Sequence, residues 1–197
     1  MKKINQILIG THNKGKFKEI SDLLPKKIKK ISPLELNIES PIENGSTFIE
    51  NSQLKAHFFC KKSNLLTLSD DSGLEVECLN NEPGIYSSRL ADQCGGFDNA
   101  MIEILKRIQE SGKKNTKAKF ISVLTIQWPN GKKISETGEI IGNISKIKGN
   151  NGFGYDPIFI PSGYSQTFGE MDYRKKLMMD HRYLAYKKLE SKIKDYF

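Results

Sequence analysis

Two neighbouring carboxylates stand in the stretch Leu66–Leu74, LTLSDDSGL, directly after an apolar run. Adjacent carboxylates repel each other, so the pair requires an explanation. One explanation is a turn, because Asp, Ser and Gly all favour turns. The other is a cation, since Mg²⁺ prefers oxygen ligands and two carboxylates at the end of a strand suit it. The stretch by itself leaves both explanations open.

Residues 10–16, GTHNKGK, have the residue types of a phosphate site. An apolar run precedes them and a helical pattern follows, so backbone N–H groups and the positive end of a helix dipole point to one spot. Lys14 and Lys16 add cations at this helix N-terminus, where the dipole disfavours them unless an anion is present. The spelling is nearly that of a P-loop, but Phe17 stands where a P-loop carries its Mg²⁺-binding hydroxyl. The pattern therefore favours a phosphate-binding loop of another kind, with an ordinary basic helix start as the alternative.

Three more stretches carry polar or aromatic residues that could bind a ligand. Asn51 and Lys55 are four residues apart and share a helical face. Phe153-Gly-Tyr-Asp156 combines a pliable backbone, an aromatic face for stacking a base and a carboxylate that accepts hydrogen bonds. Lys176 precedes the triplet Asp-His-Arg at 180–182. Alone, each has an ordinary interpretation: a surface helix, a turn with a core aromatic, and a surface ion pair.

The charge distribution allows two classes of partner. Residues 1–30 hold nine Lys against two acidic residues, a net +7, and residues 173–197 hold eight Lys and Arg against three acidic residues, a net +5. Because the whole chain carries +8, the middle carries −4. Basic ends around an acidic middle suit a small polyphosphate with a metal at its centre. They equally suit a nucleic-acid surface, whose binding would depend steeply on salt.

The remaining composition excludes several classes. A chain of 197 residues suits one domain or a two-lobed unit, and 37% apolar with 27% charged residues is typical of a soluble globular protein. No stretch approaches the ~18 apolar residues of a membrane span, and the start lacks the features of a signal peptide. Three separated cysteines without a CxxC motif favour reduced thiols in the cytoplasm, and three scattered histidines argue against a His-rich metal centre.

The elements that must position these residues follow from periodicity and capping. We expect a strand at 4–9 and a helix at 13–24, ending before Pro25. A second helix should begin near Thr47, whose spacing to Glu50 has the form of a capping box, and a short strand at 65–68 should lead into the two aspartates. Asp98 can cap a third helix that ends at Gly112.

The second half of the chain adds a hairpin and a final helix. We expect strands at 120–128 and 134–144, joined by the turn Pro129-Asn-Gly131, in which Asn-Gly tolerates positive φ at both central positions. Residues 150–157 resemble a loop, and a single helix should cover 173–194. Strands that alternate with helices, together with one hairpin, predict a mixed α/β sheet.

Six motifs, in order over almost the whole chain, resemble one known family, the non-canonical purine (inosine/xanthosine) nucleoside triphosphate pyrophosphatases. THNKGK is similar to the family's T-x-N-x-x-K, and FIENSQLKA to F-x-E-N-A-x-x-K-A. SDDSGL, EPGIYSSRLA and FGYDPIF match nearly letter for letter, and TFGEM with the later Lys and His-Arg resembles the closing motif. The chain departs from the pattern at Ser52, Gly169 and Asp180, where the family has Ala, Ala and Ser, and His12 is unusual in the first motif.

The resemblance implies a single domain over residues 1–197 with an elongated mixed β-sheet, flanking helices and two lobes around a central active-site cleft. It implies Mg²⁺-dependent hydrolysis of ITP, dITP and XTP to the monophosphate and pyrophosphate, which cleanses the nucleotide pool. A homodimer in the cytoplasm, with a purine nucleotide as its small-molecule partner and neither nucleic acid nor membrane, completes the expectation.

The resemblance also implies roles for individual residues. Asp71 would be the catalytic base, and Glu43 and Asp71 would place the metal. The residues expected to bind the triphosphate are Thr11, His12, Asn13, Lys14, Gly15, Lys16 and Lys55. Those expected to touch the sugar, base or remaining substrate are Ser72, Phe153, Gly154, Tyr155, Asp156, Lys176, His181 and Arg182.

Two physical expectations accompany these roles. Asp71 beside a cation should have a lowered pKa and stay ionised. Arg182 donates hydrogen bonds only. It should therefore donate to the 6-keto oxygen of a purine, whereas the amino group of adenine, itself a donor, would leave Arg182 without a partner. The rival predictions are a pyrophosphatase for pyrimidine or modified nucleotides, a P-loop NTPase that releases orthophosphate, and a nucleic-acid-binding protein.

Overall fold

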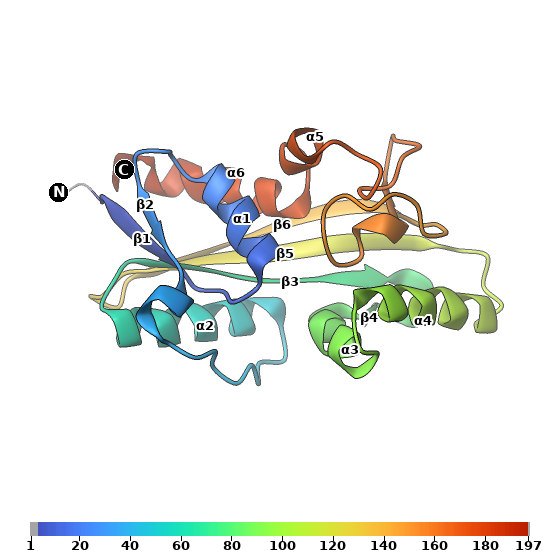
Figure 1. The fold of residues 1–197 in the computed structure, drawn as a ribbon, viewed down its shortest axis with the longest axis horizontal. Helices are drawn as coiled ribbons and strands as arrows, with labels where there is room; N and C mark the ends of the chain where they lie inside the picture. Colours follow the sequence, from blue (N-terminus) through green and yellow to red (C-terminus); the bar gives the residue numbers. More distant parts are fainter. Residues whose placement is uncertain (1–3, 197) are drawn as a thin grey trace. The chain divides into compact units, whose positions relative to one another are not determined.

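The computed structural model describes residues 4–196, which form a mixed sheet flanked by helices (Figure 1). The seven strands are β1 (Gln6–Ile9), β2 (Lys29–Ile31), β3 (Thr67–Val76), β4 (Glu82–Pro83), β5 (Lys117–Gln127), β6 (Lys133–Ile144) and β7 (Phe159–Pro161). Their order is β2-β1-β3-β5-β6-β7, and β4 pairs with β3. Strand β1 is parallel to β2 and β3, whereas β4 and β7 pair antiparallel with their neighbours. The predicted mixed α/β sheet is confirmed.

The helices are α1 (Lys14–Leu23), α2 (Phe48–Ser63), α3 (Ser87–Gln93), α4 (Phe97–Glu110), α5 (Tyr173–Leu177) and α6 (His181–Ile193). Short 3₁₀ turns cover Pro33–Leu36, Glu77–Leu79, Gly84–Tyr86, Asp156–Ile158 and Lys194–Tyr196. None of the helices within residues 4–196 is long and apolar enough to cross a membrane.

The described chain divides into two compact units. Unit 1 comprises residues 4–71, 122–138 and 182–196, and unit 2 comprises residues 72–121 and 139–181. The chain passes from one unit to the other inside β3, β5 and β6, and again at the start of α6. Whether the whole chain is a single domain with a central cleft stays a prediction.

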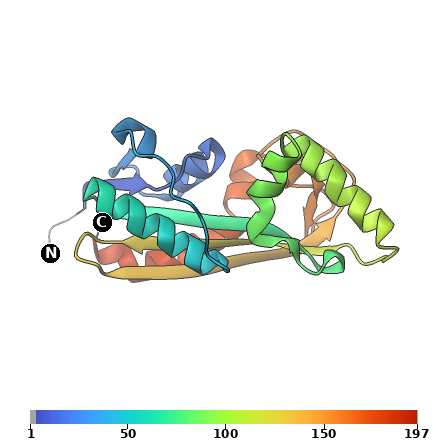
Figure 2. The same cartoon turned by 90° about the horizontal axis from the view of Figure 1, so that it is seen from below.

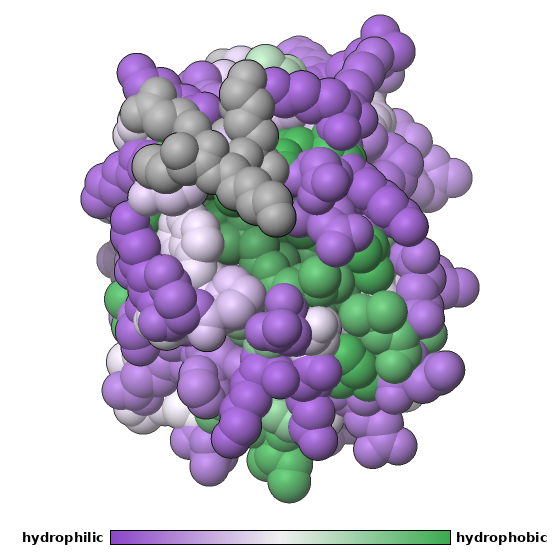
Figure 3. Space-filling model, turned by 90° about the vertical axis from the view of Figure 1, so that its left-hand side faces the viewer, coloured by the Kyte–Doolittle hydropathy of each residue, from purple (hydrophilic) through white to green (hydrophobic). Residues whose placement is uncertain are grey.

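Unit 1 buries both faces of its part of the sheet. In β1, Ile7 and Ile9 face α1 and α6, whereas Leu8 faces α2 and packs with Phe59. Successive strand side chains point to opposite faces, so a strand covered on both sides is a continuous apolar run. Figure 2 shows α2 lying across one face of this part of the sheet. The surface seen in Figure 3, from the left-hand side of Figure 1, is mostly hydrophilic, with an apolar area near its middle.

Unit 2 has a core of its own. The buried face of α4 consists of Ala100, Met101, Ile104 and Ile108, which pack in one cluster with Phe120 of β5. This confirms the predicted third helix, but its cap is Gly96 rather than Asp98, which lies in the first turn of the helix. The first-turn position still places the carboxylate near the positive end of the helix dipole.

Several boundaries were predicted from local signals. Asn13 caps α1 by accepting from Lys16 N, and Thr47 caps α2 by accepting from Glu50 N. The Glu50 carboxylate also accepts from the backbone and hydroxyl of Ser46. The hairpin turn needs positive φ only at Gly131, where φ is 91°.

Two predictions about elements were wrong. The expected short strand at 65–68 is the ten-residue β3, which carries both aspartates in its interior rather than at its end. The expected helix at 173–194 is two helices, because residues 178–180 interrupt it between Leu177 and His181. No Gly or Pro marks that interruption, so periodicity alone could not show it.

Candidate active site

Asp70 and Asp71 lie on opposite faces of β3 and are both buried, with 0% and 5% of their surface exposed. Because side chains alternate along a strand, the two carboxylates point away from each other. Asp70 contacts residues of α1, β5 and α6, and Asp71 contacts Lys55 of α2. The repulsion between neighbours is thus resolved by separate sets of cations, and the turn interpretation is wrong.

Asp70 is the centre of a buried ionic cluster. Lys16 Nζ lies 2.9 Å from Asp70 Oδ2, and Arg182 Nη2 lies 3.4 Å from the same oxygen. Ser122 donates to Asp70 Oδ1 at 2.5 Å, and Arg182 also pairs with buried Glu19. Burial alone would raise the pKa of Asp70, but Arg182, Lys16 and Ser122 hold it well below its usual range. Asp70 is therefore a fixed negative charge that holds two of the predicted substrate-binding cations.

Asp71 belongs to a second cluster. Lys55 Nζ lies 2.7 Å from Asp71 Oδ1 and 3.0 Å from Glu43 Oε2, so one ammonium bridges the two predicted metal ligands. Burial would lower the pKa of Lys55, but Asp71 and Glu43 raise it above its ordinary value, so Lys55 stays charged. Asp71 Oδ2 is buried and has no hydrogen-bond partner among residues 4–196.

The expected lowering of the Asp71 pKa was wrong. Burial raises the pKa of Asp71 to about 6 and outweighs the opposing effect of Lys55 and Lys16. The physical reason is that removal of a carboxylate from water costs more here than its two lysines return. At neutral pH the group is still mainly ionised, and it is a stronger base than an exposed aspartate.

The loop before α1 is shaped by its own side chains. Thr11 Oγ1 accepts from Asn13 N at 3.1 Å, and His12 donates through Nε2 to Ile38 O at 3.0 Å while Nδ1 lies 2.6 Å from Ser40 Oγ. A Cβ at Gly10 would lie 2.3 Å from Ser69 Oγ, so the close packing of this loop requires glycine. Lys14 is exposed at the start of α1, and both ring nitrogens of His12 are engaged within the chain.

The predicted residues of unit 2 form a buried ion pair beneath a loop. Asp156 Oδ2 accepts from Lys176 Nζ at 2.6 Å and from Phe153 N at 2.8 Å. Lys176 is 2% exposed, and its ammonium lies 5.0 Å from the centre of the Phe153 ring. The Asp156 carboxylate thus anchors its own loop, predicted at 150–157, and Lys176 pairs with it in the buried interior of unit 2.

Tyr155 and His181 have packing roles in unit 2. Tyr155 donates to Ser87 O at 2.8 Å and packs edge-on against Phe97, and burial raises the pKa of its hydroxyl. The ring of His181 stacks on Phe120, with centroids 4.9 Å apart. Gly154 has a φ of 67°, a conformation that favours glycine, and Ser72 follows Asp71 directly on β3.

The structure therefore gathers five of the predicted residues of unit 1 into two neighbouring clusters, whereas those at 11–15 lie in the loop before α1 and the start of α1. Lys16 and Arg182 meet at Asp70, and Glu43, Lys55 and Asp71 meet one residue further along β3. Sequence reasoning considered Asp70 only as one of two carboxylates for a cation, and gave no role to Glu19 or Ser122. A signal existed for Asp70, which is the other carboxylate of the opening motif, but none for its partners on α1 and β5.

The carboxylates fit a magnesium ion, although no group of three His, Cys, Asp or Glu side chains gathers in residues 4–196. Mg²⁺ is commonly bound through one or two carboxylates, with water and substrate phosphates as its other ligands. Glu43 and Asp71 supply two carboxylates around one cationic position, and the buried Asp71 Oδ2 is an acceptor that lacks a partner in the described chain. This donor set therefore suits Mg²⁺ delivered with a polyphosphate.

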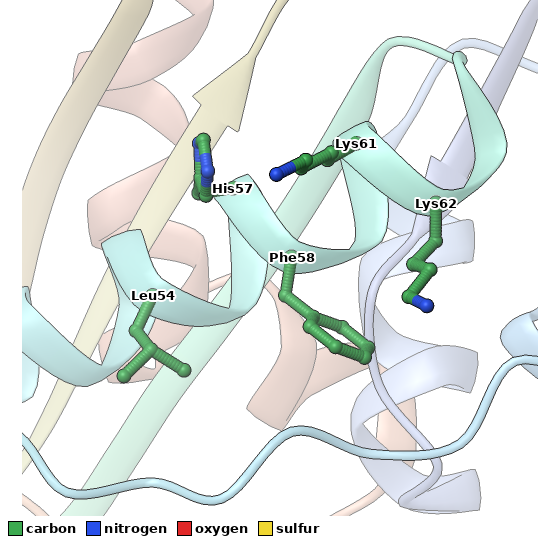
Figure 4. Close-up of a pocket in the computed structure, with 5 residues that line it drawn as sticks. All are labelled: Leu54, His57, Phe58, Lys61 and Lys62. Carbon is green, nitrogen blue, oxygen red and sulfur yellow. The ribbon is translucent and has the colours of Figure 1, made fainter.

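A separate pocket of about 570 Å³ lies along the outer side of α2 (Figure 4). It is lined by Leu54, His57, Phe58, Lys61 and Lys62, none of which is a predicted site residue. In Figure 4, Lys61 extends toward His57, and Phe58 projects from the helix on another side. This pocket therefore lies apart from the clusters around Asp70 and Asp71 in the set of residues that form it.

Comparisons with known proteins show what the chain is similar to. The model of the Ham1 family matches residues 7–192. A dITP/XTP pyrophosphatase of Zymomonas mobilis is 38% identical over 187 residues, which cover 93% of this chain and 90% of that protein. A dITP/XTP pyrophosphatase of Caulobacter vibrioides is 39% identical over 191 residues, covering 96% and 98%.

Solved structures agree with the fold. The structure of a HAM1 protein from Coxiella burnetii has a TM-score of 0.86 at 31% identity, covering 98% of this chain and all of that one. The Staphylococcus aureus Ham1 protein has a TM-score of 0.84, with the same identity and coverage.

Proposed function

Because the chain belongs to the Ham1 family, we propose that it hydrolyses dITP, XTP and ITP to the nucleoside monophosphate and pyrophosphate. The observation that carries this proposal is the pair of carboxylates on β3. Asp70 fixes Lys16 and Arg182, while Asp71 keeps one buried oxygen without a partner in the described chain, next to Lys55. Lysines that can bind an anionic substrate thus lie next to Asp71, a base whose pKa is raised.

The reaction is the displacement of pyrophosphate by water at the α-phosphorus. Water forms a bond to phosphorus as the bond to the leaving pyrophosphate breaks, and Asp71 Oδ2 accepts the proton that the water loses. Lys14, Lys16, Lys55 and the backbone N–H groups at the start of α1 bind the phosphates and stabilise the charge that develops on the leaving group.

Magnesium is part of the proposal. Held by Glu43 and Asp71, Mg²⁺ would neutralise charge on the phosphate oxygens. Removal of the metal with EDTA is expected to reduce turnover to background, and addition of Mg²⁺ should restore it. Turnover that persists in EDTA would contradict a role for the two carboxylates as metal ligands.

The other loop residues have supporting roles in this proposal. The side chains of Thr11 and Asn13 accept backbone N–H groups of the loop and of α1, and His12 contacts Ile38 and Ser40. Gly15 lies in the first turn of α1, where we assign it to the phosphate site. The phosphates are thus bound mainly by backbone N–H groups and lysines.

Sugar and base are assigned to the remaining predicted residues. Phe153 offers a ring for stacking, and its loop of Gly154 and Tyr155 is anchored by the Asp156–Lys176 pair. Ser72 and His181 are assigned to substrate contacts, and Arg182 supplies a donor for the 6-keto group. Because Arg182 also neutralises Glu19 and Asp70, we assign it a second role in the electrostatics of the cluster.

A substrate panel tests the function. Purified protein with Mg²⁺ should convert dITP, XTP and ITP far faster than dATP, and should release pyrophosphate rather than orthophosphate. Faster hydrolysis of pyrimidine or modified nucleotides would favour the rival pyrophosphatase, and orthophosphate would favour an NTPase of another type. We further propose a cytoplasmic homodimer, and sedimentation of the purified protein tests the dimer.

A further inference from the structure

The side-chain amide of Asn51 is buried. Its oxygen accepts a hydrogen bond, whereas its nitrogen has no partner in the described chain. Asn51 is 0% exposed on α2, and its Oδ1 accepts from Gly45 N at 2.8 Å. Its Nδ2 finds no hydrogen-bond partner among residues 4–196. Nearly all buried donors in proteins are paired, so this amide N–H group requires an acceptor from elsewhere.

The orientation of the amide is fixed by chemistry. Gly45 N–H is a donor, so the Asn51 atom that faces it must be the oxygen, and the NH₂ group must point the other way. A Cβ at Gly45 would lie 2.6 Å from Asn51 Oδ1, so the loop approaches the amide as closely as glycine allows. The loop is the one that carries Glu43, two residues earlier.

The unpaired donor lies beside the second cluster. Asn51 is one helical turn before Lys55, on the same face of α2, and Lys55 contacts both Asp71 and Glu43. Within unit 1, this region thus contains a donor, Asn51 Nδ2, and an acceptor, Asp71 Oδ2, each buried and without a partner in the described chain. The acceptor suits a cation or the proton of a water molecule, whereas the donor requires an electron-rich oxygen.

We propose that Asn51 Nδ2 donates a hydrogen bond to a phosphate oxygen of the nucleotide, while Asn51 Oδ1 holds the Gly45 turn. A metal-bound water is a poor acceptor, because one of its two lone pairs binds the metal and the cation withdraws charge from the other. A phosphate oxygen is an acceptor in every state, and its charge strengthens the bond. Asn51 is thus a substrate-binding residue with a second, positioning role, and the inference rests on the proposed function.

Binding of inorganic pyrophosphate without metal tests the direct contact. In EDTA, Glu43 has no metal to position, so a loss of affinity reports the amide itself. Calorimetry on Asn51→Ala should show pyrophosphate affinity reduced about ten- to a hundredfold, the usual effect of losing a hydrogen bond to a charged group. Affinity within twofold of the wild-type value would overturn the proposal.

Asn51→Asp separates the two halves of the amide. It keeps an oxygen for Gly45 N–H but replaces the donor by a negatively charged acceptor, so pyrophosphate affinity should fall further than in Asn51→Ala. Asn130→Asp is the matched control, because Asn130 Oδ1 also accepts a backbone N–H, from Lys132 at 3.1 Å, on the exposed hairpin turn. This control should bind pyrophosphate as the wild type does.

Kinetics complete the test and separate the inference from the proposed function. With dITP and Mg²⁺, Asn51→Asp should raise KM at least tenfold, and Asn130→Asp should leave KM unchanged. If the wild type releases no pyrophosphate from dITP, the proposed function fails. If the wild type does so and both Asn51 variants bind pyrophosphate normally, only the inference fails. Should Asn51→Asp not fold, Asn51→Ala decides the question alone.

Discussion

Adjacent residues of one type have opposite acid–base properties in this chain. Both aspartates of β3 are buried, but Asp70 has two cations and a hydroxyl on it, whereas Asp71 shares Lys55 with Glu43. The pKa of Asp70 therefore falls well below its ordinary value, while that of Asp71 rises to about 6. One carboxylate holds cations in place and the other can accept a proton, a division set by strand alternation.

Asp71→Asn should remove turnover and preserve substrate binding. The amide cannot accept the proton of the attacking water, so kcat should fall by about 10³-fold or more. Lys16 and Lys14 remain, so calorimetry with dITP should still detect binding. Asp98→Asn, an exposed change in the first turn of α4, is a charge-matched control. Turnover close to the wild-type rate would exclude Asp71 as both base and metal ligand.

The acidic limb of the pH profile should report Asp71. Below about pH 6 this carboxylate is protonated in the free enzyme, and it then accepts no proton, so kcat/KM should fall about tenfold per pH unit. Asp70 has a lowered pKa and stays ionised throughout this range. Rates measured from pH 5 to pH 8 check the limb, and a kcat/KM that stays level down to pH 5 would assign the proton transfer to another group.

At the scale of elements, the predictable parts are those with local signals. The start of α1 was predicted from helical periodicity, the start of α2 because Thr47 is a capping residue, and the β5–β6 hairpin because Asn-Gly131 marks its turn. The length of β3 could not be predicted, because Asp is unfavourable in strands and the burial of these two depends on distant partners such as Arg182, Lys16 and Lys55. Tertiary contacts, not propensity, decide that element.

The same division applies to the site. Lys16, Lys55 and Asp71 were expected from the resemblance, whereas the contacts of Asp70 with Ser122 and Arg182 join residues more than fifty positions apart. The interruption before α6 had a signal that was not used: Asp180, a favoured helix-capping residue, stands directly before His181. Pairings between distant segments leave no pattern in a single sequence.

The cluster between α1, β3 and α6 should contribute to the stability of unit 1. Arg182 and Glu19 are each 1% exposed, so Arg182→Ala would leave two buried carboxylates with one cation fewer. We expect a loss of about 3–5 kcal/mol in the free energy of unfolding, together with a raised KM for ITP. Denaturant unfolding measures the first effect. The double variant with Glu19→Gln should recover part of that loss, and strictly additive effects would show that the two side chains are not coupled.

At the scale of the whole molecule, the basic charge has a specific use in the proposed function. Residues 1–30 carry +7, and this segment supplies Lys14 and Lys16 at the start of α1, while the acidic middle of the sequence supplies Glu43 and Asp71. A field of this kind raises the rate at which a polyanion reaches its site. The same field would also attract nucleic acid, so charge alone does not distinguish a nucleotide from a nucleic acid as the partner. Measurements of binding and hydrolysis at different salt concentrations are needed to distinguish them.

Salt should therefore weaken capture of the nucleotide without changing the chemical step. Between 50 mM and 500 mM NaCl, kcat/KM for dITP should fall about several-fold, because screening shortens the reach of the lysines, while kcat stays constant. Lys14→Gln should reduce both kcat/KM and its salt dependence, whereas Lys26→Gln, an exposed lysine in the same basic segment, should change neither by more than about twofold. Equal effects of the two substitutions would mean that the nucleotide responds to the overall charge of the surface and not to Lys14 in particular. Tight, salt-sensitive binding of duplex DNA with no hydrolysis of dITP would replace the enzyme by the nucleic-acid-binding alternative.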